Sequence, residues 1–520
     1  MLDRIINKRY FPLFVFLAAA GLYLFNSWGV SIYILDEAKN ASCAREMLEN
    51  GNILAPTFNG ALRTDKPPLH YFFMFMSYTV FGVNPFGARF FSAIFGALTV
   101  LMTFRYTQKF SNTQTAFWTS IVLLASIHLS IQFHLAVPDP YLIFFMVWSH
   151  FAFFAAINCD NKREVFYMYF AMAMGTLAKG PVAILLPGLV FLLFLVFSRN
   201  LKWKTIAKLK PLTGALLVLL LVLPWYILNG IETDWEWTRG FFLKHNINRF
   251  SDSMEGHGGS FLITLLFILA GMFPFSVYLP QAILSGFKQR KNPFILFNLV
   301  AGITIVVFFS ISQTKLPNYT VPSYPFLAVL TAFFIGNKTV VFKNLKVGFF
   351  VLLSLSILLP IAGFIAMKFD PSLESVRGIA AWLLVLPVIN ILVWIYRKHR
   401  SGFLLLQGLS GILTAVVFFA FIYPAIDQQN PVAKSKELIK NRELVYFEKF
   451  NPSYAFYQKK EIPKIDADEF YTFFENHPDG LIISTKKKIK PVLLDEKYEI
   501  IFSAKDVFES PTTVLIAKKK

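Results

Sequence analysis

The sequence predicts an α-helical polytopic membrane protein with about 13 transmembrane helices and a small C-terminal α/β domain outside the cytoplasm. The 520 residues are 55% hydrophobic and only 16% charged, and the mean hydropathy is +0.53. Soluble globular proteins carry about 25% charged residues. Apolar runs long enough to cross a bilayer recur from the N-terminus to Pro424, and after Pro424 the composition becomes polar and mixed.

Thirteen apolar runs approach or exceed the length of a transmembrane helix. The run 165–178 is the shortest of them. A further stretch, 69–83, is apolar enough either to span or to lie along the membrane surface. The thirteen runs are 11–33, 87–104, 114–135, 139–157, 165–178, 181–197, 211–229, 260–284, 293–312, 317–336, 347–367, 378–396 and 403–424.

The distribution of Lys and Arg decides between the two roles of 69–83, because cytoplasmic loops are enriched in these residues. If 69–83 does not span and the N-terminus is cytoplasmic, nearly every basic cluster falls inside. We therefore expect 69–83 to be a juxtamembrane segment, with a cytoplasmic N-terminus and an external C-terminus. The net charge of +19 is thereby assigned to cytoplasmic loops facing anionic lipid, and no nucleic-acid partner is expected.

Two domains follow from this topology. Residues 1–424 form the transmembrane domain, with an external loop at 36–86 that carries juxtamembrane helices. Residues 425–520 form a small α/β domain, in which ELVYFEKF, GLIISTKK and TTVLIAKK predict strands and VAKSKELIKN and ADEFYTFFENH predict helices.

The external ends of the spans collect charged and polar groups from distant parts of the chain. Carboxylates suit a general base or a metal ligand, whereas Lys, Arg and Tyr suit a phosphate. The candidate residues are Asp36, Glu37, Arg45, Asp65, Lys66, Asp139, Lys179, Arg249, His257, Lys315 and Tyr319.

Each of these residues also has a simpler explanation. Asp36 and Asp139 could each cap a helix, where Asp is favoured. Lysines at span ends commonly extend toward lipid headgroups. Lys66, Lys179 and Lys315, however, all precede Pro or Gly-Pro on the face where basic residues are disfavoured. This coincidence favours a functional role for the three lysines.

The ordered motifs resemble the membrane glycosyltransferases with the GT-C fold. The resemblance is strongest to the bacterial lipid A aminoarabinose transferases, within the dolichyl-phosphate-mannose protein mannosyltransferase superfamily. It rests on LDEAKNASCAREMLENGNILAPTFNGALRTDKPPLHY, VNPFGARFFSAIFGALTV, LAKGPVA, the loop 245–257 and KLPNYTVPSYPFLAVL, and it covers about residues 10–335.

The resemblance implies transfer of a sugar from a polyprenyl-phosphate donor to an envelope glycolipid, glycan or protein, at the external face of a bacterial inner membrane. It implies catalytic roles for Asp36 and Asp139. Four residues would bind the donor phosphate: Lys66, Arg249, Lys315 and Tyr319. Glu37, Arg45 and Lys179 would support the site.

A divalent metal ion is a further expectation from the resemblance. Asp65 and His257 match positions near a metal in relatives, although Asp65 stands where the family pattern has the longer Glu. The alternative function is a transporter or flippase for a lipid-linked sugar, since such proteins also need intramembrane charges. Against it, the charges here lie at span ends, and the two halves of the chain show no evident symmetry.

Overall fold

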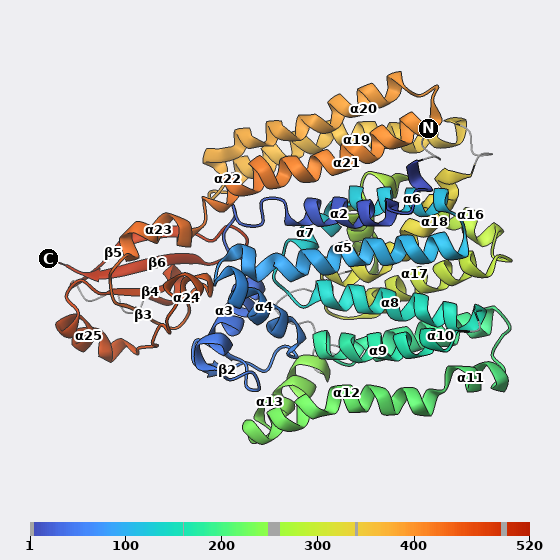
Figure 1. Ribbon diagram of the computed structural model, residues 1–520. Coiled ribbons are helices and arrows are strands. Elements are labelled where there is room, and N and C mark those ends of the chain that lie inside the picture. The colour runs from blue at the N-terminus through green and yellow to red at the C-terminus, as the bar shows by residue number, and fades with distance from the viewer. Residues whose placement is uncertain (1–4, 160, 248–259, 338–341, 490–496, 520) are drawn as a thin grey trace.

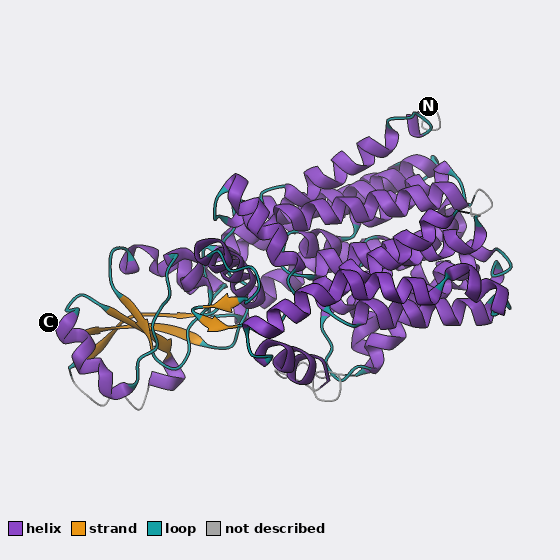
Figure 2. Cartoon of the chain, turned by 60° about the horizontal axis from the view of Figure 1, so that its bottom comes forward, coloured by secondary structure: helices purple, strands orange, loops and turns teal. Residues whose placement is uncertain are grey.

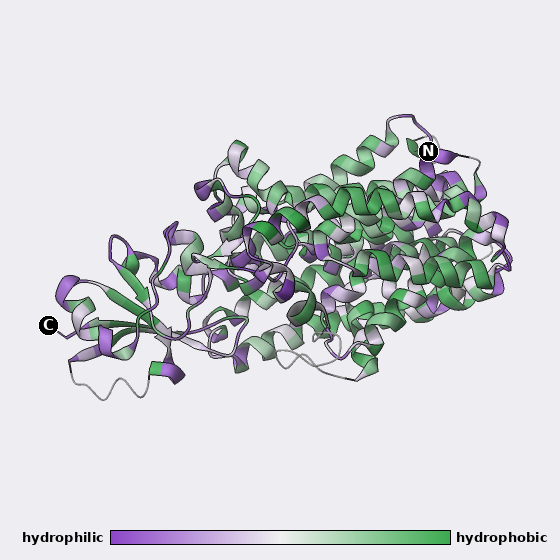
Figure 3. Ribbon diagram, turned by 90° about the horizontal axis from the view of Figure 1, so that it is seen from below, coloured by the Kyte–Doolittle hydropathy of each residue, from purple (hydrophilic) through white to green (hydrophobic). Residues whose placement is uncertain are grey.

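The computed structural model describes residues 5–159, 161–247, 260–337, 342–489 and 497–519. Figure 1 shows a long bundle of helices with a small sheet at one end, next to the C-terminus. The strands gather at that end of the molecule (Figure 2). The bundle is predominantly hydrophobic, and the sheet end is mixed (Figure 3). This distribution is that of an integral membrane protein whose helical bundle lies in the bilayer.

Among the described residues, eight helices are long and apolar enough to cross a membrane, or up to ten if each of two bent pairs forms one span. The predicted number of 13 stays a prediction. The bundle contains α2 (Phe11–Leu24), α5 (Pro85–Phe110), α6 (Thr113–Ala125), α7 (Ile127–Phe133), α8 (Asp139–Asn158), α9 (Lys162–Lys179), α10 (Val182–Phe197), α12 (Pro211–Glu232), α15 (Phe261–Gly271), α16 (Leu279–Lys288), α17 (Pro293–Ile311), α18 (Tyr324–Gly336), α19 (Phe342–Phe369), α20 (Val385–Ile395) and α21 (Arg400–Val417).

Two predicted spans are broken. The run 114–135 is divided at Ser126 into α6 and α7, which meet at 68°. The run 260–284 bends by 117° between α15 and the helical segment that begins at Phe275. Pro274 lies in this second break, where its ring and missing N–H interrupt the helix. Apolar composition alone does not reveal either bend.

The loop between α2 and α5, which the sequence predicts to be external, forms two helices and a hairpin. Helix α3 (Leu35–Asn50) ends at Gly51, whose φ of 66° is readily available to glycine. The hairpin pairs β1 (Thr57–Phe58) with β2 (Ala61–Leu62). Helix α4 (Leu69–Phe81) has 13 residues, or about 20 Å, which is shorter than a hydrocarbon core of about 30 Å. Helix α4 is thus about as long as α2, which has 14 residues, and the juxtamembrane place of 69–83 stays a prediction.

A buried ion pair holds this loop on the bundle. Arg89 of α5 is 1% exposed and Glu37 of α3 is fully buried. The guanidinium donates to both carboxylate oxygens of Glu37, each at 2.8 Å, and also to the carbonyls of Ser27, Val30 and Ser31. The backbone N–H of Ala136 donates to the same carboxylate at 2.8 Å. Both buried charges are therefore extensively hydrogen-bonded, as a buried pair requires.

The C-terminal segment forms a four-stranded sheet in the order β3-β4-β6-β5. Strands β3 and β4 are parallel, and the remaining pairs are antiparallel. Strands β3, β4 and β6 and helices α23 and α25 lie in the segments predicted from the sequence, whereas β5 and α24 were not predicted. The elements are α22 (Tyr423–Asp427), α23 (Pro431–Ile439), β3 (Leu444–Tyr446), α24 (Ser453–Gln458), α25 (Phe470–Asn476), β4 (Leu481–Thr485), β5 (Tyr498–Lys505) and β6 (Thr512–Lys518).

This sheet segment docks on the external loop. The Tyr33 hydroxyl donates to Asp506 at 2.6 Å. The Asn59 side chain donates to the carbonyl of Ile462 at 2.9 Å and accepts from its N–H at 2.8 Å. Asn59 has a φ of 54°, and it lies at the tip of the β1–β2 hairpin. The loop is therefore held between the bundle on one side and the sheet segment on the other.

Replacing Arg89 by Met should strongly destabilise the protein, by about 3–5 kcal/mol, because it leaves the buried Glu37 carboxylate without its cation. The double variant Glu37→Gln/Arg89→Met should recover part of this loss. The measurement is thermal unfolding of the detergent-purified protein. The control is Arg377→Met, which removes an exposed pair with Glu374 and should change stability by about 1 kcal/mol or less. Equal melting temperatures for Arg89→Met and wild type would contradict the assignment.

Candidate active site

Two carboxylates begin helices at the end of the bundle that carries the external loop. Asp36 lies in the first turn of α3 and Asp139 in the first turn of α8. The N-cap positions are occupied by Ile34 and Pro138, and neither helix has a side-chain cap hydrogen bond. The capping explanation is therefore wrong for both aspartates, although each charge is favourable at a helix N-terminus. Their carboxylates contact cations instead.

Asp36 lies between two basic side chains of the same loop. Its oxygens are 3.3 Å from the Arg63 guanidinium and 3.7 Å from the Lys66 ammonium. Arg63 and Lys66 are almost fully buried, whereas the Asp36 side chain is 49% exposed. Arg63 also pairs with Asp65 at 3.2 Å. The arrangement presents one accessible carboxylate against two cations that the protein shields from bulk water.

The balance of charge around Asp36 keeps it ionised. Partial desolvation by the surrounding protein raises the pKa of Asp36, but the charges of Lys66 and Arg63 together outweigh this effect and lower the pKa to about 2. The negative charge of Asp65 raises the pKa, and the more distant charge of Lys179 lowers it. At neutral pH Asp36 is therefore a fixed negative charge and a weak base.

The second carboxylate is buried and paired. Asp139 is 5% exposed. It accepts a hydrogen bond from Lys179 at 2.6 Å and one from the Asn318 amide at 2.8 Å. Lys179 is the last residue of α9, and Gly180 follows it with a φ of 89° that turns the chain toward α10. The sequence Lys-Gly-Pro thus ends a helix where its lysine reaches Asp139.

Tyr319 joins this second group. The Lys179 ammonium lies 5.2 Å from the centre of the Tyr319 ring, within the range of a cation–π contact. The ring also contacts Phe309, with centroids 5.1 Å apart. Lys315 donates to the carbonyl of Ser312 at 2.7 Å, which holds the turn before Tyr319. Because the charge of Lys179 acts on Asp36 as well, the two carboxylates belong to one electrostatic site.

The segment after α12 covers the same loop. The Trp237 indole donates to the carbonyl of Arg63 at 2.8 Å. A methyl group on Gly240 would lie 2.6 Å from the Thr64 hydroxyl, so the chain passes close to the loop there. The segment therefore approaches the site just before residues 248–259. Arg249 and His257 lie outside the described residues.

Two predicted supporting residues do not lie in the site. Glu37 binds Arg89 in the buried pair described above. Arg45 is buried beside Glu46 and Glu49 on α3, at 3.5 and 3.4 Å. Glu46 in turn accepts hydrogen bonds from the β1–β2 hairpin, at Thr57 and Asn59. Both residues thus stabilise the loop that carries Asp36 rather than forming the site itself.

The described side chains give little support to the metal site predicted at Asp65 and His257. Within the described ranges, no group of three or more His, Cys, Asp or Glu side chains could hold a metal ion. Asp65 is paired with Arg63 at 3.2 Å, which reduces its capacity as a ligand. The other predicted ligand, His257, lies outside those ranges. We therefore assign no step of the chemistry to a metal.

Three residues of the site were given no role from the sequence. Asn318 lies in the Lys-Leu-Pro-Asn-Tyr motif, so its position beside Tyr319 was a usable signal. Arg63 stands three residues before Lys66, within the same charged loop, and this spacing was a usable signal. Trp237 contacts Arg63 across more than 170 positions, and nothing local in its sequence indicates this contact.

Known proteins match this chain in family and in fold. The family model described as dolichyl-phosphate-mannose-protein mannosyltransferase matches residues 65–228. An uncharacterised protein of Aquifex aeolicus is 30% identical over 336 residues, covering 64% of this chain and 75% of the relative. A second relative is the undecaprenyl phosphate-alpha-4-amino-4-deoxy-L-arabinose arabinosyl transferase 2 of Pseudomonas fluorescens. It is 27% identical over 423 residues, covering 79% of this chain and 75% of the relative.

The fold match extends over almost the whole chain. The crystal structure of ArnT from Cupriavidus metallidurans bound to undecaprenyl phosphate superposes with a TM-score of 0.81, covers 98% of each chain and is 19% identical. This likeness shows the shared fold, and the family match and the relatives define the class of the chain, a membrane glycosyltransferase of the GT-C fold. Within that class, the chain belongs to the family of the aminoarabinose transferases and the dolichyl-phosphate-mannose-protein mannosyltransferases. The resemblance seen in the sequence is confirmed.

Replacing Arg63 by Gln should raise the pKa of Asp36, because one of its two nearest cations is lost while partial desolvation still raises the pKa. The ionised form is lost as the pH falls through the pKa. The acid limb of the activity profile should therefore move to higher pH in the variant. Infrared difference spectra of the carboxyl band, assigned with Asp36→Asn, measure the pKa directly. If the carboxyl band titrates at the same pH in the variant and in wild type, Arg63 does not control the pKa of Asp36.

Proposed function

We propose that this protein transfers a sugar from a polyprenyl-phosphate donor to an ionised phosphate group of an envelope glycolipid, at the periplasmic face of the membrane. The ion pairs that hold Asp36 ionised, with Arg63 at 3.3 Å and with Lys66 at 3.7 Å, carry the choice of acceptor. A hydroxyl acceptor needs a base near the working pH to remove its proton. A phosphate acceptor is already ionised and needs none. The sugar is a pentose or a hexose, in keeping with the arabinosyl transferases among the relatives.

The buried cations support the donor half of the reaction. When the bond between the sugar and the donor phosphate breaks, negative charge develops on the departing polyprenyl phosphate. Lys66 lies 3.7 Å from Asp36, longer than a charge-assisted hydrogen bond. Its ammonium has three donors, so it can bind a phosphate while it still faces Asp36. Donors that are already in place stabilise such charge without reorganisation.

The acceptor half follows from the same geometry. An acceptor phosphate oxygen attacks the anomeric carbon from the side opposite the leaving phosphate, so the configuration inverts. One C–O bond forms, one breaks, and no proton is transferred. Asp139 is held by Lys179 and Asn318, and this group suits the binding and orientation of the sugar or the acceptor. The N-terminus is then cytoplasmic and the sheet segment periplasmic, as the basic residues predict.

The experiment compares envelope lipids by mass spectrometry in a deletion strain complemented with wild type, Asp36→Asn or the control Asp466→Asn. Asp466 is an exposed carboxylate of the sheet segment. We expect a pentose- or hexose-sized mass on a glycolipid with wild type and the control, and a loss of about a hundredfold or more with Asp36→Asn. A sugar on a phosphate should be released by mild acid, whereas a sugar on a hydroxyl should remain.

Full product from Asp36→Asn would overturn the role of Asp36, and an acid-stable product would overturn the phosphate acceptor.

A second measurement separates transfer from transport. The purified protein should consume a polyprenyl-phosphate sugar when acceptor is added. If the donor crosses vesicle membranes but is never consumed, the protein is a flippase.

A further inference from the structure

A pocket lies at the end of the bundle opposite the candidate active site. Helix α9 runs from Lys162 to Lys179 over 18 residues, or about 27 Å, close to the thickness of a hydrocarbon core. Lys179 is in the active site, so Lys162 is near the other membrane face. There the start of α9 meets α11 (Trp203–Leu209) and α12, and together they enclose a cavity of about 400 Å³.

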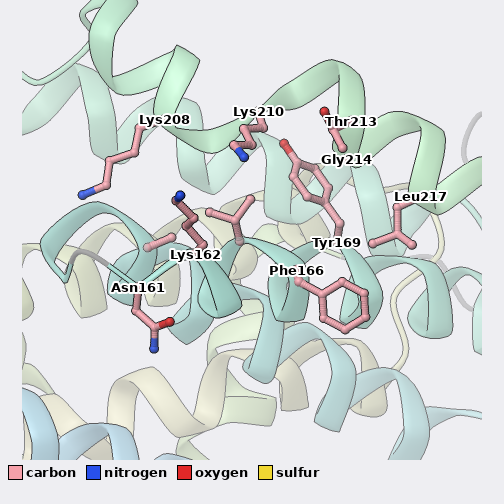
Figure 4. Close-up of a pocket in the computed structure, with 11 residues that line it drawn as sticks. Asn161, Lys162, Phe166, Tyr169, Lys208, Lys210, Thr213, Gly214 and Leu217 are labelled. Carbon is pink, nitrogen blue, oxygen red and sulfur yellow. The ribbon is translucent and has the colours of Figure 1, made fainter.

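Three lysines from two separate segments line this pocket: Lys162, Lys208 and Lys210. Figure 4 shows them on both sides of the opening, Lys162 on one helix and the other two on the facing segment. Lys208 also donates to the carbonyl of Ile157 at 3.3 Å, which fixes it beside the end of α8. The described residues that line the pocket include no Asp or Glu. The nearby Glu164 pairs with Lys109 at 3.0 Å.

The remaining wall is apolar and continuous with the lipid-facing surface. Val165, Phe166 and Leu217 line the pocket, and Phe166 is 50% exposed. On the same helix as Leu217, Leu212 is 86% exposed and Leu216 is 56% exposed. In a membrane these side chains face acyl chains. The pocket therefore has a cationic edge at the membrane surface and an apolar side toward the bilayer.

A glycine sets the shape of the floor. A Cβ atom on Gly214 would lie 2.1 Å from the Tyr169 ring, so only glycine admits the ring against α12. The Tyr169 hydroxyl points toward Lys210 and Thr213 in Figure 4. It adds a hydrogen-bond donor at the cationic edge. Polar donors and three ammonium groups thus converge above an apolar floor.

We propose that this pocket binds an anionic glycerophospholipid of the leaflet opposite the active site. The lipid phosphate contacts Lys162, Lys208 and Lys210. An acyl chain follows Val165, Phe166 and Leu217 toward the bilayer. Charge complementarity selects an anionic headgroup, as basic pockets between transmembrane helices do. A soluble phosphate would contact only the lysines. A lipid contacts the lysines with its headgroup and the apolar wall with its acyl chain, and the pocket therefore favours a lipid. The bound lipid fixes α9 relative to α12.

Native mass spectrometry of the purified full-length protein tests this proposal, with cardiolipin and phosphatidylcholine as probes. Wild type should retain cardiolipin about tenfold or more strongly than phosphatidylcholine. The variant Lys162→Gln/Lys208→Gln/Lys210→Gln should bind cardiolipin about tenfold or more weakly, because three cations at the headgroup are lost. Inorganic phosphate at the lipid concentration should not displace cardiolipin.

The control variant is Lys202→Gln/Lys204→Gln/Lys291→Gln. It removes the same charge from exposed positions outside the pocket lining and should bind cardiolipin as wild type does. Circular dichroism and thermal unfolding verify that both variants are folded. Equal binding by the pocket variant and wild type, equal retention of phosphatidylcholine, or equal losses in both variants would overturn the proposal. Displacement by inorganic phosphate would instead assign the pocket to a soluble anion.

Discussion

The buried pair of Arg89 and Glu37 positions both site carboxylates. Glu37 directly follows Asp36 in α3, so its two hydrogen bonds to Arg89 fix the start of that helix. Glu37 also accepts from the N–H of Ala136, three residues before Asp139. Since a buried pair is destabilising unless its geometry is satisfied, the loop and the start of α8 have little freedom. Asp36 and Asp139 are thus held by one interaction, although 103 residues separate them.

The sheet segment restrains the same loop from outside. Its contacts fall on both sides of α3, at Tyr33 before the helix and at Asn59 after it. Asp427, at the end of α22, accepts from the N–H and the hydroxyl of Ser31. Arg89 binds the carbonyl of Ser31 from the bundle side. The loop between α2 and α5 is therefore held by both parts of the chain, and the described part of the C-terminal segment contributes to its geometry from outside the candidate site.

The order of motifs along the sequence predicted Asp36, Lys66, Asp139 and Lys179 because each stands at the end of a helix or span, where local pattern is informative. The order of motifs did not show that Asp36 and the adjacent Glu37 have different partners. Consecutive residues of a helix point about 100° apart, and the partner that Glu37 faces is 52 residues away. Arg45 was assigned to the site because the sequence pattern does not show which partner a helical residue faces. The breaks at Ser126 and Pro274 lie within continuous apolar runs, so the pattern did not reveal them either.

The charges of the site match those of the proposed transition state. A departing sugar gains oxocarbenium character while the leaving phosphate gains negative charge. Under the proposed function, Arg63 and Lys66 are the fixed positive charges that face the phosphate. Asp36 is a fixed negative charge whose low pKa keeps it ionised at neutral pH. Neutralising Asp36 therefore removes more than a base. It leaves two buried cations beside a sugar that is becoming positive, which opposes the reaction that the same cations assist at the phosphate.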